Sequence, residues 1–412
     1  MHPDVTVVGA GAAGLATAIF LRRARADLRV ALLDGARRPG AKILVSGGSR
    51  CNVTNVRVTE RDFWGGSRSS IRQVLGSFSV EQTVAFFRRL GVALHEEERG
   101  KLFPDSNRSR DVLEALLHEA DRAGVVRLDA HRVLGLANDS DGFTIETSQG
   151  EIRAHRVVLA TGGQSLPRSG SDGAGWEIAR RLGHRIVPPV PALVPLLLDP
   201  GAALAHADLS GVSHDAEIAV WLEGRVAERI EGPLLWTHFG ISGPAALDVS
   251  RHWTRATCDG RRVELTLSFL PGCSFDRADA RLVSLAAGRS RASLQTIVAD
   301  LVPAAVAAAL LGALRIDPSQ PAGSLTREAR RQLAHALAEW RLPVVGTRGY
   351  NVAEVTAGGV DLAEIDPKTM ASRVCPGLFL VGEMIDVDGR LGGFNFQWAW
   401  ASAKTAARAL AS

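Results

Sequence analysis

The chain has 412 residues, of which 46% are hydrophobic and 22% are charged. This length suffices for two or three domains with sizeable cores, and no long low-complexity segment interrupts them. The four cysteines show neither C-x-x-C pairs nor metal-ligand spacing, so we expect a reducing compartment, no disulfide framework and no metal site. The formal net charge of +4 comes from scattered arginines, which permits a polyanionic partner without establishing one.

The first 34 residues carry the pattern of a nucleotide-binding βαβ unit. A β-branched run at 5–8 precedes Gly9-Ala-Gly11-Ala-Ala-Gly14, an apolar helical stretch follows, and Asp34 ends a second apolar run. Gly9 permits a tight turn, Gly11 lets the backbone approach a pyrophosphate, and Gly14 lets helix pack on strand. The helix N-terminus then faces phosphates, and Asp34 accepts bonds from ribose hydroxyls. The alternative is a structural glycine-rich turn.

Helical and strand patterns alternate up to about residue 190, as α/β architecture requires. Helical spacing covers 80–90 and 112–123, and strands are predicted at 143–147 and 152–159. The second of these strands ends in Ala160-Thr161-Gly162-Gly163, another strand-to-glycine turn. Four prolines between positions 188 and 195 exclude a helix interior and a central strand. They predict a stiff crossover into another domain.

The secondary-structure pattern changes in the middle of the chain. Period-two alternation at 217–222 and 263–269 predicts antiparallel strands, whereas 277–314 and 325–340 are mainly helical. After Pro343 the α/β pattern of the first 190 residues returns, with a buried strand from Leu378 that ends in Gly382 and Glu383. We therefore predict a nucleotide-binding domain split in sequence: its first part at 1–190, an inserted β-rich part at 191–275, a helical domain at 276–340, and a return at 341–412.

Three strand-to-glycine turns thus occur, at Gly9, Gly162 and Gly382. Carboxyl ends of parallel strands share one edge of a sheet, where ligands bind. The third turn adds acidic residues and a glycine-rich loop at 389–394 before a helix start. A helix N-terminus aimed at N1 and the C2 carbonyl of a flavin stabilises the charge of the reduced ring, which favours FAD over a nicotinamide cofactor alone. Glycine-rich helix packing is the alternative.

Several longer segments resemble the HI0933-like (aminoacetone-oxidase-type, BaiN-like) family of FAD-binding flavoproteins. They are Ala41–Asn55, Leu235–Pro244, Val355–Val360 and Gly382–Ala399, and they are spread over nearly the whole chain. Two positions depart from the family pattern. Ser49 stands where a third glycine is expected, and Trp236 stands where Phe is usual.

The resemblance implies an α/β fold with a Rossmann-like split FAD-binding domain, an inserted β-barrel-like domain and a small helical domain. It also implies non-covalent FAD and a set of cofactor-binding residues. These are Gly9, Gly11, Ala13, Gly14 and Asp34 for the ADP half, Val133 for the adenine, Lys42, Ser46, Asn52, Thr54 and Asn55 along the flavin, and Ala160, Thr161, Gly162, Gly382, Glu383, Asp386, Gly392, Gly393, Phe394 and Asn395 to complete the site.

By the same resemblance, family substrates include conjugated double bonds of steroid-like acids and uridine in ribosomal RNA. No second glycine motif serves a nicotinamide, so a reductant such as NAD(P)H would meet the flavin directly. We predict a cytoplasmic FAD-dependent oxidoreductase without a membrane partner that reduces a carbonyl-conjugated C=C bond, with ribosomal-RNA uridine favoured. The alternatives are a small-molecule NAD(P)H-dependent enone reductase or amine/ketone oxidase, and a non-catalytic or sensory flavin-binding protein. The oligomeric state stays open.

Reduction of such a bond needs a proton donor opposite the hydride. Cys51 is one candidate, and Arg50 beside it could stabilise a thiolate or a substrate oxyanion. Its alternative role is that of a small apolar filler, as free cysteines usually are. His238 is a second candidate, as an acid or a substrate contact, with a structural role as its alternative.

Overall fold

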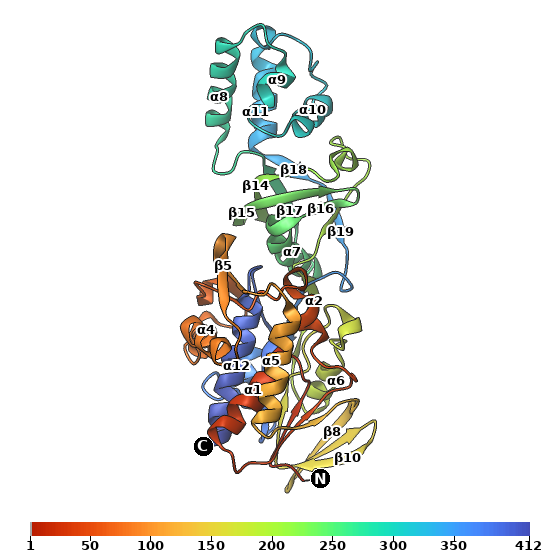
Figure 1. Cartoon of the computed structure of the whole chain (residues 1–412). Coiled ribbons are helices and arrows are strands. Elements are labelled where there is room, and N and C mark those ends of the chain that lie inside the picture. Colours follow the sequence, from red (N-terminus) through yellow and green to blue (C-terminus); the bar gives the residue numbers. More distant parts are fainter. Residues whose placement is uncertain (1) are drawn as a thin grey trace. The chain divides into compact units, whose positions relative to one another are not determined.

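The computed structural model describes residues 2–412, which form two compact units (Figure 1). The first comprises the described residues up to Pro191 together with Glu354–Ser412, and the second comprises Ala192–Ala353. The sequence predicts four parts, at 1–190, 191–275, 276–340 and 341–412, and this finer division into domains stays a prediction. Within residues 2–412, no helix is long and apolar enough to cross a membrane.

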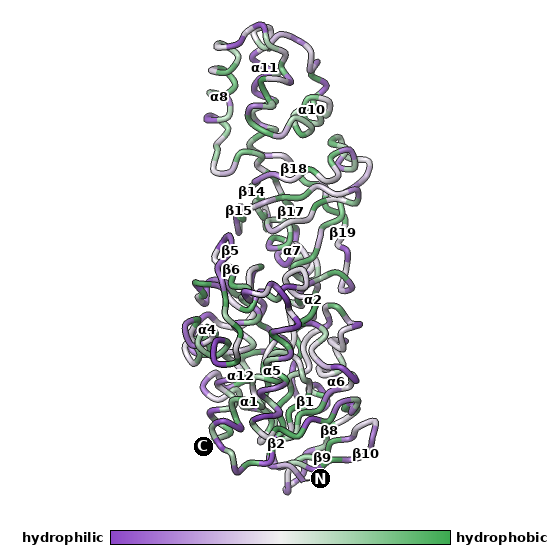
Figure 2. The backbone as a smooth tube through the Cα atoms, viewed as in Figure 1, coloured by the Kyte–Doolittle hydropathy of each residue, from purple (hydrophilic) through white to green (hydrophobic). Residues whose placement is uncertain are grey.

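A parallel sheet of five strands forms the centre of the first unit. Its order is β21-β11-β1-β2-β7, and all its pairings are parallel. Three of the strands are buried along their whole length, as expected for a sheet covered on both faces, and Figure 2 shows β1 among them as mainly hydrophobic. The strands are β1 (Val5–Val8), β2 (Val30–Leu33), β7 (Val126–Leu128), β11 (Arg156–Leu159) and β21 (Leu378–Leu380).

Helices cover this sheet, and α1 (Ala12–Ala24) packs beside α12 (Phe394–Ala411) although the two lie at opposite ends of the chain (Figure 1). The helix predicted at 80–90 is α4 (Val80–Arg89), which a capping box of Ser79 and Gln82 starts. The helix predicted at 112–123 begins earlier, as α5 (Ser109–Arg122). The other helices of this unit are α2 (Ala41–Ser49), α3 (Arg68–Leu75) and α6 (Ala174–Arg181).

Short ladders of two or three strands complete the first unit, and one of them changes the interpretation of the proline-rich segment. Ile186–Ala192 forms strand β12, which pairs with β20 (Val355–Val360) in a sheet of two strands. Proline is tolerated there because each strand of such a pair keeps one open edge. The segment does leave for the second unit, but the predicted crossover missed this strand. Three further sheets, all antiparallel, belong to this unit. One contains β3 (Thr54–Asn55), β6 (Lys101–Pro104) and β5 (Leu94–Glu97), and another contains β8 (Val133–Asp139), β9 (Gly142–Thr147) and β10 (Gly150–Ala154). The third pairs β4 (Phe63–Gly65) with β22 (Val387–Gly389).

The second unit contains an antiparallel sheet of seven strands in the order β18-β17-β14-β15-β16-β13-β19. Its two edge strands are β18, which pairs with β17, and β19, which pairs with β13. Only Pro343 separates these two edge strands in sequence, so the two edges of the sheet lie close together. The sheet is therefore curled, which agrees with the expected barrel-like insert. The strands are β13 (Leu196–Leu198), β14 (Ser213–Leu222), β15 (Arg225–Thr237), β16 (Gly240–Ser242), β17 (Val263–Ser268), β18 (Trp340–Leu342) and β19 (Val344–Thr347).

Helices account for the rest of the second unit. The long helix α7 (Gly243–Cys258) packs on the sheet and buries its apolar face there. The predicted helical region contains α8 (Phe275–Gly288), α9 (Leu294–Val298), α10 (Ala304–Ala313) and α11 (Arg327–Ala338). The predicted period-two strands at 217–222 and 263–269 lie in β14 and β17, which pair with each other.

Candidate functional site

The three predicted glycine turns meet at the carboxyl edge of the parallel sheet. A Cβ added to Gly9 would lie 2.5 Å from the carbonyl oxygen of Ala160, so the first and second turns are in contact. A Cβ added to Gly382 would lie 2.7 Å from Cβ of Ala13, so the third turn touches the start of α1. Thr161, between them, donates to Sδ of Met384. One small region therefore collects residues more than 370 positions apart.

Two glycines of the first turn have different surroundings. A Cβ on Gly14 would lie 1.8 Å from the carbonyl oxygen of Gly9, which shows that Gly14 is needed for helix-to-strand packing. A Cβ on Gly11 would meet no protein atom within 4 Å. Gly11 is also the N-cap of α1, and no side chain caps that helix. The helix N-terminus thus borders open space, as an anion-binding helix start must.

Asp34 organises the backbone around that opening. Its Oδ2 accepts from the N–H of Ala10 at 2.7 Å, and its Oδ1 accepts from the N–H of Ala36 at 2.8 Å. The backbone carbonyl of Asp34 accepts from the N–H of His131, which brings Val133 at the start of β8 to the same end of β2. Each carboxylate oxygen keeps a second lone pair, so a ribose hydroxyl can still bind.

A buried hydroxyl without a protein partner lies at the second turn. Oγ of Ser171 makes no hydrogen bond to residues 2–412. A Cβ on Gly162 would lie 2.9 Å from this oxygen, so the hydroxyl lies close to the turn. Buried polar groups are nearly always satisfied in folded proteins. This edge therefore combines a buried hydroxyl without a protein partner with open space at Gly11.

An ion pair joins helix α2 to the third turn. Nζ of Lys42 lies 2.5 Å from Oε2 of Glu383, and Oε1 of Glu383 accepts from the N–H of Thr356 at 3.0 Å. The hydroxyl of Thr356 in turn accepts from the N–H of Ser165. The predicted residues Lys42 and Glu383 are therefore in direct contact. Thr356 is a partner that the sequence alone did not single out.

The last residues of α2 and the segment that follows have an unusual backbone. Helical geometry ends at Ser46, and Gly47 and Gly48 have φ values of 55° and 67°. Ser49 and Cys51 also lie in the left-handed region, with φ of 67° and 63°. Glycine adopts this region without strain, which explains why the family pattern expects a glycine at Ser49. The hydroxyl of Ser46 donates back to the carbonyl of Ile43.

The predicted residues that follow bind this segment to the loop before α12. Nδ2 of Asn55 donates to the carbonyl of Gly392 at 3.1 Å, and the amide of Asn52 is placed to accept from the N–H of Gly393. The hydroxyl of Thr54 donates to Oε1 of Gln397 at 2.7 Å. Gln397 is buried and also accepts from Thr83, so it is a central residue that sequence reasoning did not name.

The rest of the third turn is held by short-range contacts. The side chain of Asn395 both accepts from the N–H of Gly389 and donates to its carbonyl. The N–H of Asp386 donates to the carbonyl of Val360. Phe394 is buried, with its ring edge-on to that of Phe63. Phe394 therefore contributes packing beneath the loop.

The thiol of Cys51 is closed off from solvent and lies beside the hydroxyl of Ser46. Its exposed fraction is 0%, and burial raises its pKa to about 12. Arg50 points to other partners: its Nη1 lies 2.5 Å from Oε1 of Glu97, and its guanidinium lies 4.1 Å from the centroid of the Phe103 ring. Arg50 thereby lowers the pKa of Glu97. These contacts favour the packing alternative for Cys51, and its catalytic role stays a prediction.

His238 lies in the second unit, at the tip of the hairpin between β15 and β16. It is exposed, and its ring contacts that of Phe239 at 5.1 Å between centroids. Thr237 donates to the carbonyl of Gly240 and closes the tip. The hairpin leaves the imidazole accessible, and its role as an acid or substrate contact stays a prediction.

Comparison with known proteins gives the wider context. A family model described as the HI0933-like protein Rossmann domain matches residues 3–409. The chain belongs to this family. Its members are FAD-dependent oxidoreductases, and the chain is an enzyme of this class. Both the predicted family and the predicted fold class are confirmed.

Two relatives are similar over almost their whole length. A 3-dehydro-bile acid delta(4,6)-reductase of Clostridium scindens is 33% identical over 407 residues, covering 99% of this chain and 98% of the relative. A ribosomal RNA dihydrouridine synthase of Escherichia coli is 33% identical with the same coverage. Among solved structures, an E. coli quinol fumarate reductase subunit has a TM-score of 0.53 at 18% identity, covering 100% of this chain and 70% of that one. That likeness shows the fold alone.

Proposed function

We propose that the protein binds FAD non-covalently at the edge where the three glycine turns meet. The open space at Gly11 carries this proposal, because a Cβ there would meet no protein atom although the neighbouring Gly14 is tightly packed. The uncapped start of α1 and the unsatisfied hydroxyl of Ser171 support it. The N–H groups of the first turn would hold the pyrophosphate, and Asp34 and Val133 would hold the ribose and adenine.

The remaining predicted residues would line the flavin. Lys42 and Glu383, already paired, would lie near one side of the ring, and the uncapped start of α12 would face its N1 and C2 carbonyl. Purified protein should be yellow, and acid should release the flavin into the supernatant, since no residue is placed by the sequence to bind it covalently. A colourless protein that FAD cannot reconstitute would contradict the proposal.

We further propose that the enzyme reduces a C=C bond conjugated to a carbonyl. Both relatives support this, since one is named a delta(4,6)-reductase and the other a dihydrouridine synthase. When bound, FAD supplies hydride from its reduced ring, with NAD(P)H as the proposed reductant. The protein must then stabilise negative charge on the acceptor carbonyl and deliver a proton to the adjacent carbon.

Arg50, Cys51 and His238 are the proposed catalytic residues. Hydrogen-bond donors in the Arg50–Asn55 segment would stabilise the acceptor carbonyl. Cys51 and His238 are the two proposed proton donors. The thiol of Cys51 is closed off and burial raises its pKa to about 12, whereas the imidazole of His238 is exposed. A group with so high a pKa transfers its proton poorly near neutral pH.

Uridine in ribosomal RNA is the acceptor we favour, because a dihydrouridine synthase matches the whole chain and the sequence pI is about 9.1. The deciding experiment is nucleoside analysis of ribosomal RNA from cells with and without this protein. Loss of one dihydrouridine in the deletion supports the proposal. An unchanged content, together with turnover of a steroid-like enone, favours the small-molecule alternative that the bile-acid reductase suggests. Absence of turnover with every reductant would favour a binding or sensory role.

A further inference from the structure

One surface of the second unit brings aromatic rings and arginines together. A hollow of about 440 Å³ beside α8 and α11 is lined by Phe275, Arg331, His335, Glu339 and Trp340, among others. The guanidinium of Arg331 lies 4.8 Å from the centroid of the Phe275 ring, and the rings of Phe275 and His335 lie 6.5 Å apart. Phe275 and Trp340 are only partly covered, so each presents part of a ring to solvent.

Helix α11 extends this surface with a basic stripe. Arg327, Arg331 and His335 follow one another at intervals of four residues and therefore lie on one face of the helix. All three are exposed. Neither arginine has a carboxylate within ion-pair distance in the described part of the chain. Their charges thus remain available to an anion, whereas the nearby Arg330 is paired with Asp279.

The aromatic character continues past Trp340. This residue also lines a second hollow, on the curled sheet, together with Trp253, Arg341 and Val344. Trp340 therefore lies where two hollows adjoin, and indole rings lie in both. Partly exposed rings at intervals, with cations beside them, are the features that bind single-stranded nucleic acid through base stacking and phosphate contacts.

We propose that the aromatic–arginine surface, made of Phe275, Arg327, Arg331, His335 and Trp340, docks a single-stranded segment of the RNA substrate. Phosphates bind Arg327 and Arg331, and bases stack on Phe275 and Trp340. Glu339, the acid in the first hollow, repels phosphate but accepts hydrogen bonds from base N–H groups, so it fits the base end of the surface. The inference rests on the proposed RNA acceptor and adds where the RNA is held.

The test compares two pairs of substitutions that change the charge equally. Holoenzyme carrying Arg327→Glu and Arg331→Glu is compared with holoenzyme carrying Arg225→Glu and Arg261→Glu, two exposed arginines of the same unit outside the surface. A fluorescein-labelled uridine dodecamer is titrated at several salt concentrations. We expect the stripe pair to weaken binding at least about tenfold and to lower the salt slope by about 1.4, because two phosphate contacts are lost. The control pair should change the affinity less than about threefold.

Two further measurements separate stacking from charge, and docking from chemistry. Phe275→Ala should weaken binding about five- to 100-fold with an unchanged salt slope. FAD content and reduction by NAD(P)H should stay at wild-type levels in every variant. Equal effects of the two arginine pairs would overturn the docking surface, even if dihydrouridine is still formed. The docking surface would also be overturned if Arg327→Glu with Arg331→Glu left RNA binding intact but changed the oligomeric state, since the surface would then contact a second copy. A third outcome is possible, in which the Arg327 and Arg331 substitutions abolish RNA binding but the enzyme reduces only enones. That outcome would support the docking surface and refute RNA as the acceptor.

Discussion

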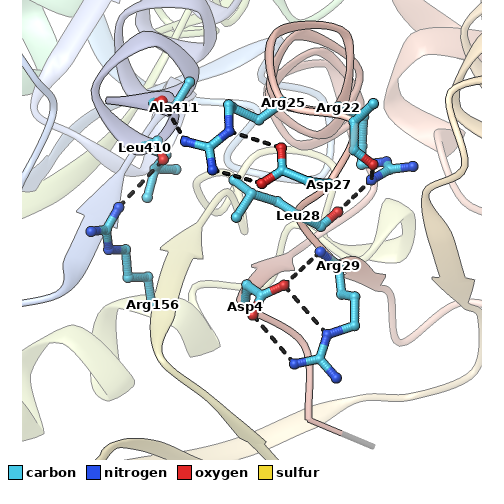
Figure 3. A network of polar contacts seen from close by, with 10 residues as sticks. Asp4, Arg22, Arg25, Asp27, Leu28, Arg29, Arg156, Leu410 and Ala411 are labelled. Carbon is cyan, nitrogen blue, oxygen red and sulfur yellow. Dashed lines mark hydrogen bonds and ion pairs between the residues drawn. The ribbon is translucent and has the colours of Figure 1, made fainter.

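The two ends of the central parallel sheet satisfy their polar groups in opposite ways. At the amino ends of the strands, side chains bind one another and the chain (Figure 3). Asp4 accepts from the N–H of Arg29 at 2.7 Å, Arg25 forms an ion pair with Asp27, and Arg156 donates to the carbonyl of Leu410. This network joins the sheet to the end of α12.

At the carboxyl ends the chain leaves polar groups unused. No side chain caps α1, and the hydroxyl of Ser171 has no partner in residues 2–412. Because buried donors and acceptors are costly when unpaired, the difference supports the proposal that the ligand binds at the carboxyl end. A fold can therefore reveal a ligand site through what its two ends do differently.

The largest effect should come from glycines that differ only in their surroundings. Gly14→Ala places a methyl group 1.8 Å from the carbonyl of Gly9, so the helix must move off the strand. We expect a loss of about 3 kcal/mol in the free energy of unfolding, or failure to fold. Thermal unfolding of the protein measures it. A Gly14→Ala variant as stable as wild type would show that the turn is less tightly packed than described.

Gly11→Val should abolish FAD binding while leaving the fold intact. Gly11 has φ of −81°, which valine adopts, and its Cβ would meet no protein atom. The added atoms would occupy the approach of the pyrophosphate. The flavin-to-protein ratio of the purified variant should fall to nearly zero, with an unchanged circular dichroism spectrum. The matched control is Gly312→Val, another open glycine, in α10. Full flavin content in the Gly11→Val variant would remove the main support for the site.

These glycine roles show which parts of the site were predictable. The needs of a tight turn and of helix packing are local, so Gly9 and Gly14 could be assigned from their spacing. Contacts between distant residues were not predictable: Gln397 joins Thr54 and Thr83 across more than 300 positions. The strand within the proline-rich segment was missed for the same reason, because its partner β20 comes about 170 residues later.

The proton donor gives the next contrast. His238→Gln should keep FAD and flavin reduction but slow reoxidation by the acceptor about 10²- to 10⁴-fold, the usual cost of losing a general acid. Cys51→Ala is the paired variant. Because the thiol is fully buried, we expect it to lose about 1 kcal/mol of stability and to reoxidise near the wild-type rate. Stopped-flow kinetics separates the two half-reactions. The reverse outcome would make Cys51 the donor.

Burial of Cys51 also predicts a dependence of stability on pH. Its pKa is 9.0 in the unfolded chain and about 12 in the folded protein, so the unfolded chain loses its proton first. The contribution to stability is complete below pH 9 and is lost as the pH rises towards 12. The difference in stability between wild type and Cys51→Ala should therefore shrink above pH 9. A difference that stays constant up to pH 11 would mean that the thiol reaches solvent.

A smaller effect is expected where this chain departs from its family. Ser49 has φ of 67°, a conformation that costs a residue with a side chain about 1 kcal/mol. Ser49→Gly should raise the free energy of unfolding by up to about that amount, whereas Ser49→Ala should not. Chemical denaturation compares the two. Equal stabilities would mean that the serine is held without strain, for example by a bond of its hydroxyl.

The smallest effect should arise at the amino end of the sheet. Hydrogen bonds from Arg29 lower the pKa of Asp4 below its ordinary 3.8. A carboxyl group with a lowered pKa stabilises the fold above its unfolded pKa, and this contribution disappears as the pH falls through the folded value. Asp4→Asn should thus lower Tm slightly at pH 7 and not at pH 2. Flavin content should stay unchanged at neutral pH, because Asp4 binds Arg29 at the end of the sheet opposite to the proposed site. Loss of FAD from the Asp4→Asn variant would break the contrast between the two ends.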